Sequence, residues 1–196
     1  ADGLLELVEP GGYSTRHDVS GRDYDGSVLR YTAVEGDPTE FDENYRMRCY
    51  KPDDRDRQIQ CLIVITMYNE KPDELEGTLS CVARNMAFMN YEHRIGMAGF
   101  DHGENPLPWK QTAVCVVSDG REKASLETLE WLQHERLFDE DTRMVMSRGV
   151  ETKVHLFENT LHLEHLRGDD QASVISFGED VRELAPLQCI FALKEH

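Results

Sequence analysis

The sequence lacks the features that direct a chain into a membrane or onto nucleic acid. It has no run of about 20 apolar residues, the length that crosses a bilayer, and its N-terminus does not place basic residues before an apolar stretch as a signal peptide does. Lys and Arg number 21 against 38 Asp and Glu, a formal net charge of -17. Because such a chain repels phosphate at long range, we expect no nucleic-acid partner. Because no segment is long and apolar enough to cross a bilayer, we expect the chain itself to be soluble.

Cysteine and histidine are too scattered to predict a disulfide framework or a zinc site. The five cysteines include no Cys-x-x-Cys pair, and three of them lie in apolar runs, so we expect reduced, buried side chains. His155, His162 and His165 are close in sequence, but no further Cys or His pair completes a tetrahedral set. We therefore expect no metal ligands in this chain.

Common nucleotide-binding and hydrolase motifs are also missing. No G-x-G-x-x-G follows a predicted strand and no G-x-x-x-x-G-K-[ST] occurs, which argues against a dinucleotide oxidoreductase and a P-loop ATPase. Ser118 lacks the G-x-S-x-G elbow, and no cysteine has an evident base partner. Any anionic ligand must be held by a local group of side chains that overcomes the overall negative charge.

The apolar segments that are present predict an α/β fold. Residues 61–66 (CLIVIT) and 112–118 (TAVCVVS) do not alternate with polar residues, the pattern of strands buried on both faces of a parallel sheet. Each is followed by a polar turn and a helix, and further strands are expected at 152–159 and 187–193. This order predicts a mostly parallel, doubly wound, Rossmann-like sheet.

The first helix begins at Pro72 and is expected to bury one face. Proline suits the first helical position because its missing N–H would have no partner there. Apolar residues then recur at helical spacing. The residues expected on the buried face are Leu75, Leu79, Val82, Met86 and Met89.

Polar side chains follow three of the predicted strands. Ligands of an open parallel sheet bind beyond the carboxyl ends of its strands. Here the ends carry Tyr68 and Glu70 after the first strand, Asp119 after the second, and Lys194 after the fourth. An aromatic ring can flank a base, carboxylates can accept hydrogen bonds from uracil or ribose, and a lysine can meet a phosphate. The combination predicts a pocket for uridine diphosphate (UDP).

Each strand end also has a simpler explanation. The Asp-Gly pair at 119–120 is a common turn, the segment at 68–70 can be a capping loop before the proline-led helix, and Lys194 can be an ordinary surface lysine. Three polar strand ends in one sheet are a less common coincidence. That coincidence favours the binding site.

Five segments of the sequence match the pattern of one known enzyme family. They are residues 30–34 (RYTAV), 61–70 (CLIVITMYNE), 79–86 (LSCVARNM), 114–121 (VCVVSDGR) and 186–195 (PLQCIFALKE). Together they closely resemble the start of the catalytic domain of chitin synthases, from about residue 29 to the C-terminus. The loops at 93–109 and 164–180 differ from fungal members and agree better with an oomycete-like member.

The resemblance implies an inverting, processive family-two glycosyltransferase of GT-A type. Such a hexosyltransferase moves N-acetylglucosamine from UDP-GlcNAc onto a growing β-1,4 chitin chain. Its parent protein is expected to be embedded in the plasma membrane, to act at the cytoplasmic face and to be able to dimerise. The residues that the family pattern assigns to UDP are Thr66, Tyr68, Glu70, Asp119 and Lys194.

The family pattern continues with parts that this sequence does not contain. They are a metal-binding Asp-x-Asp-like strand, a Glu-Asp pair that supplies the base, a Gln-x-x-Arg-Trp motif and transmembrane helices. A divalent cation, Mg or Mn, is therefore expected in the full enzyme with its ligands outside this chain, and no catalytic residue is expected within it. We expect the 196 residues alone not to transfer sugar.

The sequence suggests three parts. Residues 1–28 are expected to form a flexible arm, residues 29–60 a strap before the catalytic domain, and residues 61–196 the nucleotide-binding half of a GT-A domain that is incomplete at its C-terminal side.

Two alternative functions stay open. Another processive synthase, of the cellulose or hyaluronan type, would share the nucleotide site, and a nonenzymatic α/β interaction module would use the strand-end acids for a protein partner.

Overall fold

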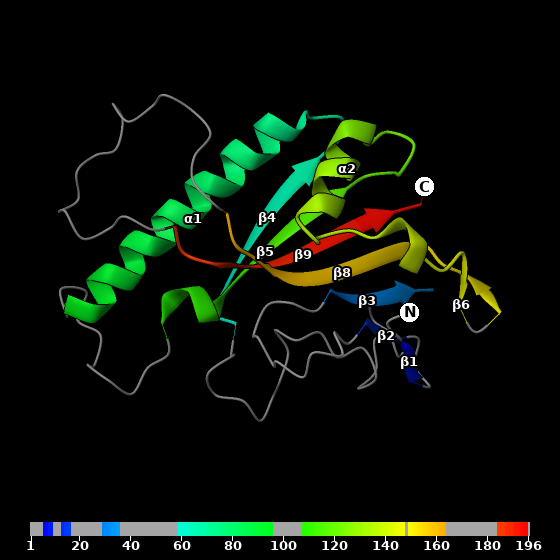
Figure 1. The fold of residues 1–196 in the computed structure, drawn as a ribbon, viewed down its shortest axis with the longest axis horizontal. Coiled ribbons are helices and arrows are strands. Elements are labelled where there is room, and N and C mark those ends of the chain that lie inside the picture. Colours follow the sequence, from blue (N-terminus) through cyan, green and yellow to red (C-terminus); the bar gives the residue numbers. More distant parts are fainter. Residues whose placement is uncertain are drawn as a thin grey trace, which may run out of the picture.

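A seven-stranded sheet organises the chain (Figure 1). The computed structural model describes residues 6–9, 13–16, 29–35, 59–95, 107–147, 149–163 and 184–195. The strands of this sheet are β1 (Glu6–Glu9), β2 (Tyr13–Arg16), β3 (Arg30–Val34), β4 (Cys61–Met67), β5 (Thr112–Ser118), β8 (Val154–Leu161) and β9 (Leu187–Lys194). The remaining elements are α1 (Pro72–Ile95), η3 (Pro108–Gln111), α2 (Leu126–His134), η4 (Glu140–Thr142), β6 (Met146–Ser147) and β7 (Val150–Glu151).

The strand order is β1-β2-β3-β8-β9-β5-β4, with β6 and β7 forming a separate hairpin. Strand β5 pairs in parallel with both β4 and β9, whereas β8 is antiparallel to β9 and to β3. Four of the five central strands therefore run in one direction, and β8 opposes them. The predicted α/β class with a mostly parallel central sheet is confirmed, as are the four strands expected near 61, 112, 152 and 187.

The first 60 residues contribute strands to this same sheet. Strands β1 and β2 lie within residues 1–28, for which the sequence predicts a flexible arm, and they pair antiparallel with each other. Strand β3, from the expected strap, pairs with both β2 and β8. The division of the chain into arm, strap and nucleotide-binding half stays a prediction.

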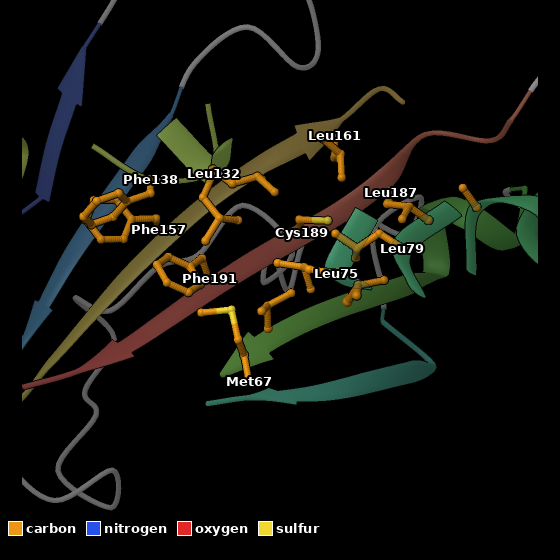
Figure 2. Packing of buried hydrophobic residues seen from close by; sticks show 14 of the residues in the cluster. Met67, Leu75, Leu79, Leu132, Phe138, Phe157, Leu161, Leu187, Cys189 and Phe191 are labelled. Carbon is orange, nitrogen blue, oxygen red and sulfur yellow. The ribbon is translucent and has the colours of Figure 1, made fainter. Parts of the chain in front are cut away.

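The core lies between the sheet and the two helices. In its central row, Val116 of β5 pairs with Ile65 on one side and Phe191 on the other, and Phe191 pairs with Phe157 of β8. Figure 2 shows Phe138 beside these phenylalanines, and its ring meets the rings of Phe157 and Phe191 edge to face. Both helices contribute leucines to this one cluster and contact each other, so they pack on the same face of the sheet. The predicted doubly wound arrangement, which places helices on both faces, was therefore wrong for the described helices.

Helix α1 begins where its sequence predicts. Pro72 is its first residue, and the backbone N–H of Lys71 donates to the Glu74 carboxylate at 3.0 Å, which satisfies a donor that the first turn leaves open. Leu75, Leu79 and Met86 are buried as expected. Met89 is 42% exposed, so its placement on the buried face was wrong. Asn90 and His93 follow Met86 at helical spacing and are buried, so the buried face continues past Met89 and leaves Met89 beside it.

The expectation that the first strand is buried on both faces was also wrong. Leu62 and Val64 of β4 are 58% and 55% exposed, and Cys61 is exposed as well. Strand β4 is the edge strand and pairs only with β5 among the described strands. Because the described helices cover the other face, one side of β4 stays in contact with solvent.

Two loop predictions are only partly covered by the described residues. Of the loop expected at 93–109, residues 93–95 belong to α1 and residues 108–109 to η3, while 96–106 lie outside the described residues. The loop expected at 164–180 lies outside them entirely.

Candidate functional site

The carboxyl ends of β4, β5 and β9 meet at one edge of the sheet. Met67 pairs with Ser118, and Ser118 with Leu193, so the three strands end in register. The turns that follow are joined by backbone hydrogen bonds. The N–H of Asp119 donates to the carbonyl of Met67 at 3.4 Å, and the N–H of Arg121 donates to the carbonyl of Lys194 at 3.0 Å.

The side chains at these ends form a connected polar group. Lys194 Nζ lies 2.9 Å from Asp119 Oδ1, and Lys123 Nζ lies 3.8 Å from Asp119 Oδ2. Lys123 Nζ also lies 5.5 Å from the centre of the Tyr68 ring, within the range of a cation–π contact. Asp119 therefore stands between two lysines, and Lys123 links it to Tyr68.

The turn after β4 is held by its own acidic residue. The backbone N–H of Tyr68 donates to Glu70 Oε2 at 2.5 Å, and this hydrogen bond lowers the pKa of the Glu70 carboxyl. Thr128 Oγ1 donates to the carbonyl of Glu70 at 2.6 Å, which ties the turn to α2. Thr66 is exposed two residues before Tyr68. The structure thus brings Tyr68, Asp119 and Lys194 into one group and places Glu70 and Thr66 in the adjoining turn and strand end.

The polar group is open to solvent, and its carboxylate is ionised. Tyr68 is 53% exposed, and the side chain of Asp119 is 61% exposed. The hydrogen bond from Lys194, together with the charges of Lys194 and Lys123, lowers the pKa of Asp119, so the carboxylate is ionised at neutral pH. Exposed ion pairs contribute little to stability. A charged ligand can therefore replace these pairs at small cost to the fold.

Gly120 shapes the turn between Asp119 and Lys123. Its φ of 110° lies in the region that L side chains rarely adopt. A Cβ at this position would also come within 3.4 Å of the Lys123 side chain. A side chain at residue 120 would strain the turn that brings the two ion-pair partners together.

Lys123 is the residue of this group that the sequence reasoning missed. The available signal was its position four residues after Asp119 in the segment DGREK, which allows an ion pair across one turn.

The histidines that are close in sequence do not form a metal site among the described residues. His155 is fully buried and hydrogen-bonded to Tyr31 and Glu195, and His165 lies outside the described residues.

The described part of the chain contains no group of three or more His, Cys, Asp or Glu that could hold a metal ion. The residues present there do not fit the divalent cation that the resemblance implies. No helix among the described residues is long and apolar enough to cross a membrane.

Comparison with known proteins decides the family. The family model of the chitin synthase-like glycosyltransferase domain matches residues 61–196, which include every element from β4 to β9. The chain belongs to this chitin synthase-like family. The resemblance inferred from the sequence segments is thereby confirmed.

Individual chitin synthases are similar over most of the chain. Chitin synthase 1 of Phytophthora sojae is 35% identical over 163 residues, which are 81% of this chain and 16% of that protein. Chitin synthase 2 of Cryptococcus neoformans is 32% identical over 168 residues, or 85% of this chain and 16% of that protein. Chitin synthase 2 of Candida albicans is 29% identical over 197 residues, covering 100% of this chain and 18% of that protein. The chitin synthase-like chain thus spans less than a fifth of the length of these relatives.

Proposed function

We propose that this chain forms the UDP-binding part of an enzyme that transfers N-acetylglucosamine from UDP-GlcNAc to a growing β-1,4 chitin chain with inversion. One observation carries the proposal. In a member of the chitin synthase-like family, an aromatic ring, a carboxylate and two lysines form one exposed group at the ends of three parallel strands. Such a group can bind a base, a ribose and a diphosphate.

The chemistry of each side chain suggests a role. The exposed ring of Tyr68 offers a flat surface to the uracil, and the carboxylates of Glu70 and Asp119 can accept hydrogen bonds from uracil N–H or ribose hydroxyl groups. Lys194 and Lys123 can each pair with a phosphate oxygen. Thr66, exposed at the end of β4, adds a hydroxyl beside the same turn.

The ion pairs of Asp119 suggest how the site takes up its ligand. Without ligand, the two lysines share the carboxylate of Asp119. A diphosphate would draw the lysines away, because its oxygens carry more charge than one carboxylate. Asp119 would then be released to accept hydrogen bonds from the nucleoside. The lysines thus provide a local positive region in a chain of net charge -17.

The rest of the proposed parent protein supplies the chemistry of transfer. Inverting transfer needs a carboxylate that deprotonates the acceptor hydroxyl, and a divalent cation, Mg or Mn, neutralises the departing diphosphate when it is bound. We assign both to residues outside this chain, and we expect the chain alone to be inactive. The proposed parent protein is embedded in the plasma membrane, with this UDP-binding part at the cytoplasmic face of the membrane, and it is able to dimerise.

Titration calorimetry on the chain tests the proposal. We expect UDP to bind at least about tenfold more tightly than uridine, because the two phosphates add charge-assisted contacts to the lysines. UDP should also raise the melting temperature, since a ligand that binds only the folded state stabilises it. ADP serves as the control for phosphate binding without uracil and should bind more weakly than UDP. Absence of heat and of thermal protection with UDP would contradict the proposal.

A further inference from the structure

A buried hydrogen-bond chain begins at the residue next to Lys194. Glu195 Oε1 accepts hydrogen bonds from His155 Nε2 at 2.6 Å and from the guanidinium of Arg143. His155 is fully buried, and the side chain of Glu195 is mostly buried. Burial alone would raise the pKa of Glu195, but these two hydrogen bonds outweigh it and the pKa is lowered. The carboxylate is therefore ionised and held by two donors.

The hydrogen-bond partners of His155 indicate which of its ring nitrogens carries the proton. The N–H of Met144 donates to Tyr31 Oη at 2.9 Å, and Tyr31 Oη lies 2.7 Å from His155 Nδ1. If the Tyr31 hydroxyl donates to Nδ1, the proton of a neutral imidazole resides on Nε2 and points at Glu195. The Tyr31 hydroxyl, both ring nitrogens of His155 and the Glu195 carboxylate then each have a hydrogen-bond partner. Burial lowers the pKa of His155, in agreement with the neutral ring.

The Glu195 carboxylate also belongs to a network of charged side chains, which we call a ring because it connects back to the end of β9. Arg143 Nη2 lies 3.1 Å from Glu140 Oε1, and Arg121 Nη2 lies 2.6 Å from the same oxygen. The backbone N–H of Arg121 donates to the carbonyl of Lys194, the residue before Glu195. The ring alternates two arginines with two glutamates and joins the turn after β5, helix η4 and the end of β9.

We infer that Glu195 is a positioning residue that holds Lys194 in place for the diphosphate of the nucleotide. This inference rests on the proposed function, since it assumes that Lys194 meets a phosphate. Lys194 is half-exposed, and its ion pair within the described residues is with Asp119, from which the ligand would displace it. Glu195, by contrast, is anchored to the fully buried His155. Consecutive residues of an extended chain point to opposite faces, so Glu195 fixes the backbone from one side while Lys194 reaches the ligand from the other.

Preorganisation explains why such an anchor affects binding. A lysine side chain loses rotamer freedom when it pairs with a phosphate, and a mobile backbone would add to that cost. The buried anchor fixes the end of β9 before the ligand arrives. Tyr31 and His155 are both buried, so they act on Lys194 through Glu195 and not by touching the ligand. Burial also raises the pKa of Tyr31 to about 12, so its hydroxyl keeps the proton that it can donate to His155.

The test compares Glu195→Gln, Lys194→Ala and the double variant by calorimetry with UDP and with uridine. Glu195→Gln keeps the size of the side chain but removes the charge that orients Arg143. We expect UDP affinity to fall about tenfold and uridine affinity to change less than about twofold, because only the phosphate contact depends on Lys194. The double variant should bind UDP no more weakly than Lys194→Ala alone.

Leu161→Val serves as the matched structural control. Leu161 is buried and pairs with Leu187 at the opposite end of β8 and β9. Its truncation should lower the melting temperature and leave the affinities for UDP and uridine unchanged.

The possible outcomes separate the inference from the proposed function. If Glu195→Gln binds UDP like the unchanged chain, or loses UDP and uridine affinity in equal proportion, the positioning role is overturned while the nucleotide site stands. Additive losses in the double variant would likewise overturn it, because they would mean that Glu195 acts independently of Lys194. If the unchanged chain binds neither UDP nor uridine, the proposed function fails and the inference with it.

Discussion

Replacing Val116 with Asp is expected to unfold the chain. Val116 is 1% exposed and sits in the central row of the sheet between Ile65 and Phe191. Its partners in this row are apolar, and a buried carboxylate without a partner costs several kcal/mol. A domain of this size has a total stability of about 5–15 kcal/mol. One substitution of this kind removes most of that margin.

Circular dichroism and thermal melting measure the effect, and Val64→Asp is the matched control. Val64 lies in the neighbouring strand, but it is 55% exposed, so the same change places the carboxylate in water. We expect Val116→Asp to lose its cooperative melting transition and Val64→Asp to keep it. Equal tolerance of both substitutions would contradict the placement of the core between the sheet and the helices.

Replacing Asp119 with Ala is expected to lower the affinity for UDP by at least about tenfold while the chain stays folded. The carboxylate is mostly exposed and its ion pairs are with half-exposed lysines, so its removal costs the fold little. In the proposed complex, however, the diphosphate draws the two lysines away from this carboxylate, which then accepts hydrogen bonds from the nucleoside. Calorimetry gives the affinity, and circular dichroism and melting give the state of the fold.

Glu122→Ala is the control for the charge that this substitution removes. Glu122 is an exposed carboxylate in the same turn, three residues after Asp119. Loss of a negative charge near a phosphate site raises anion affinity slightly by itself, so Glu122→Ala should bind UDP as well as the unchanged chain or better. Unchanged UDP binding by Asp119→Ala would remove Asp119 from the site. Unfolding of Asp119→Ala comparable to that of Val116→Asp would make its role structural.

The strands and helices could be predicted because their signals are local. The runs at 61–66 and 112–118 and the proline-led helix appear in the structure within about two residues of their expected starts. The direction of β8 could not be predicted, because pairing depends on which distant segments meet. The exposed face of β4 was missed for the same reason. A continuous apolar run does not reveal whether a second layer covers it.

The same difference between local and long-range signals applies to the candidate site. The prediction that Tyr68, Glu70, Asp119 and Lys194 are site residues came from their positions at or just after strand ends, because parallel strands end at one edge of the sheet. The contact between Tyr31 and His155 joins residues that are 124 positions apart, and no local pattern reports such a pair. Sequence reasoning considered His155 only as a metal ligand. The structure instead gives it a tyrosine and a carboxylate as partners.

The central claim is that the turns after β4 and β5 and the end of β9 form one binding site for UDP. Backbone amide chemical shifts of the isotope-labelled chain, recorded as UDP is added, test this claim most directly. The account predicts that the largest changes occur together at residues 66–70, 119–123 and 194–195 and saturate at one UDP concentration, while the strand starts at Cys61, Thr112 and Leu187 change little. Shifts that concentrate at the strand starts, or that leave any of these three segments unchanged, would contradict it.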